Sequence, residues 1–442
     1  MDSSDALIAR FLALHPRVID LSLGRIERLL ADLGHPERRL PPTIHVAGTN
    51  GKGSTIAFMR AILEAGGLSV HAYTSPHLVR FHERIRLGRI GGGRFVDEER
   101  LAEALRRCEA VNAGQPITMF EITTAAAFVL FAEMPADVLL LEVGLGGRLD
   151  ATNVIDAPAA AVVTAIGRDH GDYLGDTVEA VAAEKAGIFK RGCPAVIAPQ
   201  DYAEADAVLR EAAERIGAEP ILVATQDFAA HEERGRLVYQ DELGLMDLPR
   251  PRLVGRHQIA NAGTAIAALR AAGIGDFEAE VYEAGLTRAE WPGRLHRLTR
   301  GRLPTLAPKN AEIWLDGGHN VDAGEVTAAF MADLEERVSR PLFLIAGMLT
   351  TKDPTGYFRS FAGLVRHVFT VRVPGNDAAM EAGALAEAAE AAELSAEPVS
   401  SVKTALRLLA ENWRFEPPPR ILIAGSLYLV GDVLEQNGTP PV

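Results

Sequence analysis

The segment His45–Ser54, HVAGTNGKGS, decides the fold prediction because it places a glycine-rich turn between a strand and a helix. The run 43–47 before it is typical of a buried strand, and apolar residues recur at helical spacing across 54–65. The turn departs from the usual phosphate-binding motif G-x-x-x-x-G-K-[ST]. Val46 stands in place of its first glycine, and Gly53 separates the Gly-Lys pair from a hydroxyl residue. The segment is therefore either a variant nucleotide site or only a glycine-rich turn.

The physics of this turn favours the nucleotide site. Backbone N–H groups at a helix N-terminus are unpaired and carry partial positive charge, so they bind anions. The glycines let the backbone approach a phosphate closely, Lys52 adds a full charge, and Ser54 or Thr55 can reach a metal or a phosphate. Because the cradle consists mostly of backbone, a hydroxyl shifted by one residue leaves it intact.

Composition limits the class of protein. At 442 residues the chain predicts two or three domains, and 48% hydrophobic with 24% charged residues is typical of a globular protein. The net charge of −14 disfavours nucleic acid and anionic membranes as partners, although local donors and a metal can still hold a polyphosphate. Only Cys108 and Cys193 occur, the N-terminal residues lack the pattern of a signal peptide, and no apolar run is long enough to span a membrane. We expect a cytoplasmic protein.

Short aliphatic runs alternate with amphipathic stretches almost throughout, which predicts an α/β fold with a doubly wound, mostly parallel sheet. The expected strands are 43–47, 68–73, 137–143, 160–166, 194–198, 311–315, 341–346, 366–373 and 419–424. The expected helices are 54–65, 99–112, 121–133, 176–186, 203–216, 257–272, 321–337, 378–392 and 401–411. The segment 226–255 predicts a β-rich excursion, and 288–309 an interdomain connection. We therefore expect a P-loop domain over 1–295 and a smaller Rossmann-like α/β domain over 296–442.

Side chains that follow the predicted strands are candidates for chemistry. Glu142 ends the run 137–143 and His170 follows 160–166, so both are expected beside Ser54 at the carboxyl edge of a parallel sheet. The alternative for Glu142 is an ion pair with an arginine such as Arg148, and His170 is as readily structural as metal-binding.

Lys185 lies in AEKAGIFK (183–190), on the helix for which Asp176 and Glu179 predict a capping box. Alanines surround it, so its stem is expected to be buried. From the residues alone we favour an ion pair with Glu184 or Glu121.

Together these pieces resemble the folylpolyglutamate synthase and dihydrofolate synthase family, within the ATP-dependent Mur-type amide ligases. The resemblance covers nearly the whole chain and rests on motifs from both halves. They are HVAGTNGKGS, YTSPHLVRFHERI (73–85), FEITTAAAF (120–128), LEVGLGGRLDATN (141–153), DHGDYLGDT (169–177), AEKAGIFK, GRHQIANAGTA (255–265), WPGRL (291–295), LDGGHN (315–320) and GSLYLVGDV (425–433).

The resemblance implies a role for each matching position. The residues implied to bind the nucleotide are Asn50, Gly51, Lys52, Gly53, Ser54, Asn261, Arg294 and Asp316. The implied magnesium ligands are Ser75, Glu142 and His170, and Lys185 matches a lysine whose carbamate serves a second Mg²⁺. Those implied to contact the pterin substrate are Arg80, Phe120, Glu121, Leu149, Asp150 and Ala151, and the implied catalytic residues are Lys52, Lys185, Asp316 and His319.

The reaction that the resemblance implies is ATP-driven amide formation. A carboxylate of dihydropteroate or folate attacks the γ-phosphorus of ATP, and the amine of L-glutamate then displaces phosphate from the acyl phosphate. A monomer is expected, and whether the enzyme makes dihydrofolate, extends polyglutamate tails or does both stays open.

Two other functions remain alternatives. A Mur-type ligase acting on a muramyl peptide would need an N-terminal domain for UDP, for which no room is expected before residue 48. A non-catalytic nucleotide-binding protein is disfavoured, because the guanine signature N-K-x-D is absent and a second polar cluster lies at 316–320.

Overall fold

The structure is a computed structural model, and it describes residues 3–15, 20–168, 171–413 and 417–441. The chain divides into two compact units. Unit 1 comprises Met1–Pro76, Phe81–Arg252 and Gln258–Glu290, and unit 2 comprises His77–Arg80, Leu253–His257 and Trp291–Val442. The domains 1–295 and 296–442 stay a prediction.

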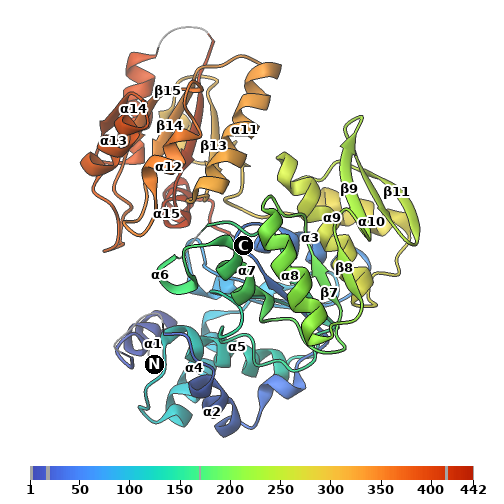
Figure 1. Cartoon of the computed structure of the whole chain (residues 1–442). Coiled ribbons are helices and arrows are strands. Elements are labelled where there is room, and N and C mark those ends of the chain that lie inside the picture. Colours follow the sequence, from blue (N-terminus) through green and yellow to red (C-terminus); the bar gives the residue numbers. More distant parts are fainter. Residues whose placement is uncertain (1–2, 16–19, 169–170, 414–416, 442) are drawn as a thin grey trace. The chain divides into compact units, whose positions relative to one another are not determined.

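Unit 1 contains an eight-stranded sheet in the order β4-β3-β2-β5-β1-β6-β7-β8. Its strands β7 and β8 are labelled beside α8 in Figure 1. The strands from β2 to β8 in this order run parallel, whereas β3 is antiparallel to β2 and β4 to β3. Their bounds are β1 (Thr43–Ala47), β2 (Val70–Tyr73), β3 (Ile85–Leu87), β4 (Arg94–Phe95), β5 (Val138–Glu142), β6 (Ala160–Val163), β7 (Ala195–Ile197) and β8 (Ile221–Val223). The mostly parallel α/β sheet predicted from the consecutive apolar runs is confirmed.

Helices cover both faces of this sheet. The helices in unit 1 are α1 (Ser4–Phe11), α2 (Gly24–Asp32), α3 (Lys52–Ala65), α4 (Glu98–Asn112), α5 (Met119–Glu133), α6 (Gly171–Leu174), α7 (Val178–Ala186), α8 (Ala203–Ile216), α9 (Arg256–Ala271, from Gln258 onward) and α10 (Ala279–Arg288), with 3₁₀ helices η1 (Pro36–Arg39) and η2 (Phe81–Arg84). His45, Leu141 and Ala161 are in register on neighbouring parallel strands, so their side chains lie on one face. Leu141 packs with α1, α2, α4 and α5, and Ala161 with α7 and α8. α3 packs against β1, β2 and β5 and against α10.

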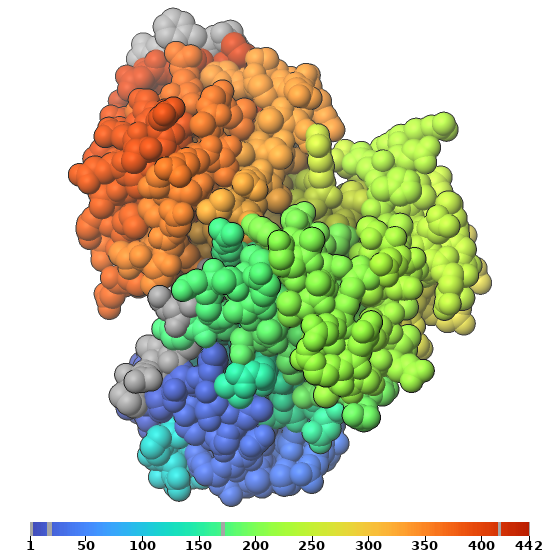
Figure 2. Space-filling view, in the orientation of Figure 1, coloured from blue at the N-terminus to red at the C-terminus, as the bar shows by residue number. Residues whose placement is uncertain are grey.

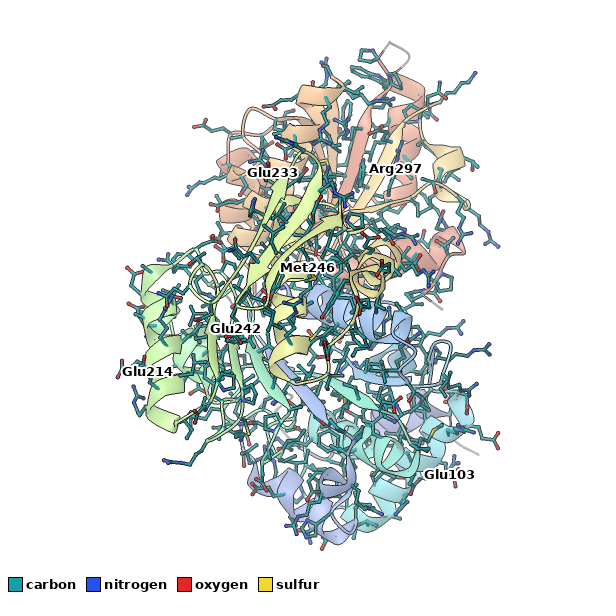
Figure 3. The ribbon with its side chains drawn as sticks, turned by 90° about the vertical axis from the view of Figure 1, so that its right-hand side faces the viewer. Glu103, Glu214, Glu233, Glu242, Met246 and Arg297 are labelled. Carbon is teal, nitrogen blue, oxygen red and sulfur yellow. The ribbon has the colours of Figure 1, made fainter. Side chains whose placement is uncertain are left out.

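A small antiparallel sheet forms the excursion predicted at 226–255. Its strands, in the order β11-β10-β9, are β9 (Phe228–Glu233), β10 (Arg236–Asp241) and β11 (Gly244–Pro249). Figure 2 shows its yellow-green tip projecting from unit 1, and Figure 3 shows Glu233 and Glu242 at its opposite ends. Asp241 accepts two hydrogen bonds of 2.6 Å from Arg270, which holds the excursion on α9.

Unit 2 is a second α/β sandwich. Its six-stranded sheet has the order β12-β13-β17-β14-β15-β16, and only β12 is antiparallel to its neighbour. The strands are β12 (His296–Arg297), β13 (Glu312–Asp316), β14 (Leu342–Ala346), β15 (Val365–Thr370), β16 (Ala396–Pro398) and β17 (Arg420–Ala424). The helices are α11 (Val321–Arg337), α12 (Pro354–Arg359), α13 (Ala382–Ala391), α14 (Val402–Asn412) and α15 (Leu427–Asn437), with the 3₁₀ helix η3 (Leu303–Leu306). Ile313 and Leu315 pack with α14 and α15, while Trp314 faces α11 and α12, so both faces are covered.

A short segment that lies within the N-terminal part of the sequence belongs to unit 2. Leu78 and Val79 pack against the core formed by α14, α15 and the sheet. A Cβ on Gly431 would lie 1.8 Å from the carbonyl oxygen of Leu78, so only glycine lets α15 approach this segment so closely. Gly293 likewise lies against the Leu78 side chain, which would be 3.5 Å from its Cβ.

One local prediction was wrong. The N-cap of α7 is Thr177, whose hydroxyl accepts from the N–H of Ala180, and not Asp176. A capping box instead joins Thr118 and Glu121 at the start of α5. Among the residues that the structure describes, none of the helices combines the length and apolarity required to cross a bilayer.

Candidate functional site

The glycine-rich turn is a tight cradle between β1 and α3. Thr49 and Asn50 donate backbone hydrogen bonds of 3.0 and 3.1 Å to Ala165, and Thr164 donates from its hydroxyl to the Asn50 carbonyl at 2.7 Å. Gly48 has φ +150°, and a Cβ there would lie 1.8 Å from the Thr164 hydroxyl oxygen. The loop after β6 therefore holds the turn in place and requires glycine at position 48.

Lys52 begins α3 and lies beside the carboxylate that ends β5. Its Nζ is 3.9 Å from Oε1 of Glu142 and donates to the carbonyls of Gly48 and Thr49 at 3.0 and 3.3 Å. The backbone N–H of Ser75 donates to Oε2 of Glu142 at 3.1 Å. Because β2, β5 and β1 are parallel neighbours, their carboxyl ends bring these groups to one edge of the sheet.

Helix α9 supplies amide side chains to the same cradle. Gln258 donates to the Ser54 hydroxyl at 3.2 Å, and Asn261 donates to Gln258 Oε1 at 3.1 Å. Gly51 has φ +89°, and a Cβ there would lie 2.5 Å from Asn261 Oδ1. Gln258 and Thr164 are site residues that the sequence reasoning missed. The signal for Gln258 is its position one helical turn before Asn261.

The loop after β5 lies against the end of α7, where Lys185 is buried. Gly147 has no space for a side chain, because its Cβ would lie 3.0 Å or less from the backbone of Glu184 and Lys185. Arg148 pairs with Glu184 at 2.7 Å, so the alternative in which Arg148 pairs with Glu142 was wrong. Lys185 is 6% exposed.

A second group of predicted substrate residues lies near the start of α5. Glu121 is 3% exposed and pairs through Oε2 with Arg25 at 3.0 Å. Arg25 also pairs with Asp20 at 2.8 Å, and its pKa is raised by Glu121 and Asp20 against the opposing effect of burial. Phe120 touches the loop after β5, since a Cβ on Gly144 would lie 2.3 Å from its ring.

Unit 2 gathers Arg294, Asp316 and His319 at the end of β13. Asp316 accepts from the N–H of Leu295 at 2.9 Å and of Gly318 at 2.8 Å, so its carboxylate shapes both adjoining turns. A Cβ on Gly317 would lie 2.7 Å from the Arg294 guanidinium, and His319 Nδ1 is 3.1 Å from the Gly317 carbonyl oxygen.

His257 adds a partly buried imidazole to this cluster, and the sequence did not single it out. Burial lowers its pKa to about 4, with Asp316 acting to raise it and Arg294 to lower it further. The neighbouring Arg294 and Asp316 are thus the charges that this imidazole meets.

The predicted site residues thus fall into two sets. Unit 1 brings together the cradle 50–54, Asn261, Glu142 and Ser75, with Lys185 and the loop 144–153 next to them. Unit 2 holds Arg80, Arg294, Asp316 and His319. His170 lies outside the described residues. Over the described part of the chain, no three His, Cys, Asp or Glu side chains cluster as a metal site.

The unit 1 groups fit a nucleotide polyphosphate and a hard divalent cation. The N-terminus of α3 and the ammonium group of Lys52 at its start offer N–H donors and positive charge to a phosphate. Glu142 and the Ser75 hydroxyl offer the oxygen ligands that such a cation prefers. The roles of the individual residues stay a prediction.

Comparisons with known proteins agree with this geometry. Residues 46–269 match the Mur ligase middle domain, and residues 300–436 match the dihydrofolate synthetase C-terminal domain. The dihydrofolate synthase/folylpolyglutamate synthase of Bacillus subtilis (strain 168) is 39% identical over 332 residues, which are 70% of this chain and 71% of that protein.

Two solved structures resemble the whole chain. FolC of E. coli in complex with DHPP and ADP matches with a TM-score of 0.86 at 30% identity, covering 98% of this chain and 97% of that chain. The bifunctional folylpolyglutamate synthase/dihydrofolate synthase of Yersinia pestis, complexed with AMPPNP and Mn ion, matches with a TM-score of 0.85 at 30% identity, covering 98% of each chain. The chain therefore belongs to the dihydrofolate synthase/folylpolyglutamate synthase family of ATP-dependent ligases.

Proposed function

We propose that this enzyme joins the amine of L-glutamate to a carboxylate of dihydropteroate, of a reduced folate or of both, at the expense of ATP. One observation carries the proposal. A glycine cradle at the N-terminus of α3 places Lys52 3.9 Å from a carboxylate that the Ser75 backbone holds at the same sheet edge. A phosphate-binding turn next to an acidic oxygen ligand is what metal-assisted phosphoryl transfer requires.

The residues act mainly by holding charge in place. The backbone N–H groups of 51–54 bind the phosphates, and Lys52 offsets the charge that grows on the transferring phosphoryl group. The substrate carboxylate attacks the γ-phosphorus, ADP leaves, and an acyl phosphate forms. The glutamate amine then attacks the acyl carbon and forms the amide, and phosphate leaves. Holding both reactants in a fixed geometry supplies much of the rate enhancement.

We assign the divalent cation to Mg²⁺, with Ser75, Glu142 and His170 as its ligands. The ion, when bound, neutralises negative charge on the phosphates and polarises the phosphoryl oxygens. For a second Mg²⁺ we propose a carbamate on Lys185, and the burial of this lysine among α7 side chains supports the assignment.

The test is phosphate release from Mg-ATP with dihydropteroate or with tetrahydrofolate, each with and without L-glutamate. Phosphate release that depends on glutamate, together with a product heavier by one glutamyl residue in mass spectrometry, is the expected result. Hydrolysis that is indifferent to glutamate would contradict the proposal. The comparison of the two pterin substrates also separates dihydrofolate synthesis from polyglutamylation.

We further propose a monomer that works in a reducing cytoplasm. Cys108 and Cys193 are free and buried, which agrees with a reducing compartment. Light scattering after size exclusion should give a mass near 47.4 kDa, and a value of twice this mass would contradict the monomer.

A further inference from the structure

A buried hydrogen-bonded chain connects β1 to the loop 144–153. His45 lies in β1, directly before the glycine cradle, and is fully buried. Its Nε2 lies 2.8 Å from the hydroxyl oxygen of Thr152, which in turn lies 2.6 Å from Oδ1 of Asp150. His45 lies 107 residues before Thr152 in the sequence, so these two side chains meet only in the fold.

The direction of these hydrogen bonds follows from the chemistry of each group. Thr152 donates its single hydroxyl proton to Oδ1 of Asp150. The threonine oxygen then accepts from His45, which must carry its proton on Nε2. Burial lowers the pKa of His45 to about 3, so the imidazole is neutral and can hold only one ring proton. The chain therefore runs from His45 through Thr152 to Asp150.

Asp150 is the centre of the loop. It is 2% exposed and accepts from the backbone N–H of Leu145 at 2.8 Å and of Thr152 at 3.0 Å. These bonds close the loop upon itself. The carboxylate is thus fixed by the loop backbone on one side and by His45, through Thr152, on the other.

The opposite side of the loop is attached to the end of α7. Arg148 donates its backbone N–H to the Glu184 carbonyl at 2.8 Å. Asn153 donates from Nδ2 to the carbonyls of Arg148 at 3.0 Å and of Gly187 at 3.1 Å. The loop is therefore fixed between the strand that carries the phosphate cradle and the helix that carries Lys185.

We propose that His45 and Thr152 are positioning residues, which hold the loop 144–153 in register with the phosphate cradle so that Leu149, Asp150 and Ala151 meet the pterin substrate. This inference rests on the proposed function, because it takes those three residues as the substrate contacts. His45 and Thr152 are both fully buried and act through Asp150. Their loss should weaken pterin binding and leave nucleotide binding unchanged.

The decisive variants are Thr152→Val, which removes the hydroxyl at constant shape, and Thr152→Ser, which retains it. Loss of one net hydrogen bond of about 1.4 kcal/mol corresponds to a rise of about tenfold in the KM for dihydropteroate. We expect this rise in Thr152→Val, with the KM for ATP within about twofold of wild type, and recovery of most of the loss in Thr152→Ser. Thr287→Val is the matched control, because that hydroxyl lies on the exposed face of α10.

His45 is tested in the same assay. His45→Leu should raise the KM for dihydropteroate as Thr152→Val does, and the double variant should be no worse than either single one, because both remove the same chain. His45→Gln keeps an N–H near the Nε2 position and should lie between Leu and wild type.

Four outcomes would overturn the inference. They are equal rises in the KM for ATP and for dihydropteroate, an unchanged KM for dihydropteroate in Thr152→Val, Thr152→Ser as impaired as Thr152→Val, and additive effects in the double variant. If His45→Leu does not fold, the two Thr152 variants still decide. A wild-type enzyme without glutamate-dependent turnover would instead refute the proposed function.

Discussion

Gly51→Ala should weaken nucleotide binding by more than the backbone strain of alanine at positive φ can explain. Gly51 has φ +89°, and the added Cβ would lie 2.5 Å from Oδ1 and 3.3 Å from Cγ of Asn261. Asn261 is 8% exposed and is hydrogen-bonded to Gln258, which in turn donates to Ser54. The amide therefore cannot turn away without breaking this chain.

The expected magnitude has two parts. A non-glycine residue at positive φ costs about 1–2 kcal/mol. Displacing Asn261 breaks its bond to Gln258 and disturbs the bond to Ser54, at about 1 kcal/mol each. The two hydrogen bonds belong to the phosphate cradle, so their loss should weaken nucleotide binding. The expected loss of binding free energy is about 2 kcal/mol, which corresponds to a Kd about 30-fold higher.

Gly67→Ala is the matched control. Gly67 has φ +84° at the other end of α3, and nothing lies within 4 Å of the Cβ that the variant would add. Titration calorimetry with Mg-AMPPNP should give a wild-type Kd for Gly67→Ala and a Kd about 30-fold higher for Gly51→Ala. Urea unfolding should show a lower free energy of unfolding in both variants, because both place alanine at positive φ. A Kd for Gly51→Ala within about threefold of wild type would refute the reasoning.

Four further perturbations test other parts of the structure. Lys52→Ala should abolish ligation while circular dichroism and melting temperature stay those of a folded protein, and retention of more than about a tenth of kcat/KM would contradict its assignment. Lys185→Ala should lose activity and regain part of it when acetate or formate is added to the assay, whereas normal activity without them would remove the carbamate proposal. Arg25→Ala should lower the free energy of unfolding by about 3 kcal/mol in urea titrations, because it leaves the buried Glu121 without its cation, and a change below about 0.5 kcal/mol would show that the pair is not needed. His45→Gln should make the free energy of unfolding fall less steeply as the pH is lowered. The pKa of His45 is about 3 in the folded state and near 6.5 in the unfolded chain, so only the unfolded state takes up this proton as the pH falls below 6.5. The free energy of unfolding of the wild type should therefore decline there by about 1.4 kcal/mol per pH unit more than that of the variant. Parallel curves for the two proteins would contradict the last expectation.

The sheets could be predicted because their strands are apolar at consecutive positions. Strands buried on both faces, such as β1, β5, β14 and β17, leave this mark directly in the sequence. Several helices show a weaker sequence pattern. α10 contains Gly285, which lowers helix propensity, yet a Cβ there would lie 2.5 Å from Ile62 of α3. The glycine is present because the two helices pack closely, and no local pattern reveals that.

The segment 288–309, which was predicted as an interdomain connection, also contains regular secondary structure. Its elements are β12 and η3. β12 is only two residues long and pairs with β13 at the edge of the sheet. A strand of this length offers no alternation to recognise, and its prolines and glycines suggest a loop.

In the site, side chains at strand ends could be located from the sequence, but their partners could not. Glu142 at the end of β5 follows from the rule that parallel strands present their carboxyl ends together. The hydrogen bond from Gln258 to Ser54 spans 204 residues, and that between His45 and Thr152 spans 107. Such pairs depend on how α9 and the loop 144–153 pack in the folded protein. The spacing of residues along the sequence does not predict this packing.

The assignment of His77–Arg80 to unit 2 limits how this enzyme can be divided into fragments. A gene fragment that starts at Trp291 encodes α15 with Gly431 but not the Leu78 backbone that covers it. The polypeptide also crosses between the units on either side of Leu253–His257, so no single cleavage point yields two intact halves. A C-terminal fragment cut at residue 290 should thus lack the backbone that packs on Gly431 of α15. A peptide that contains residues 77–80 should bind to this fragment and raise its stability.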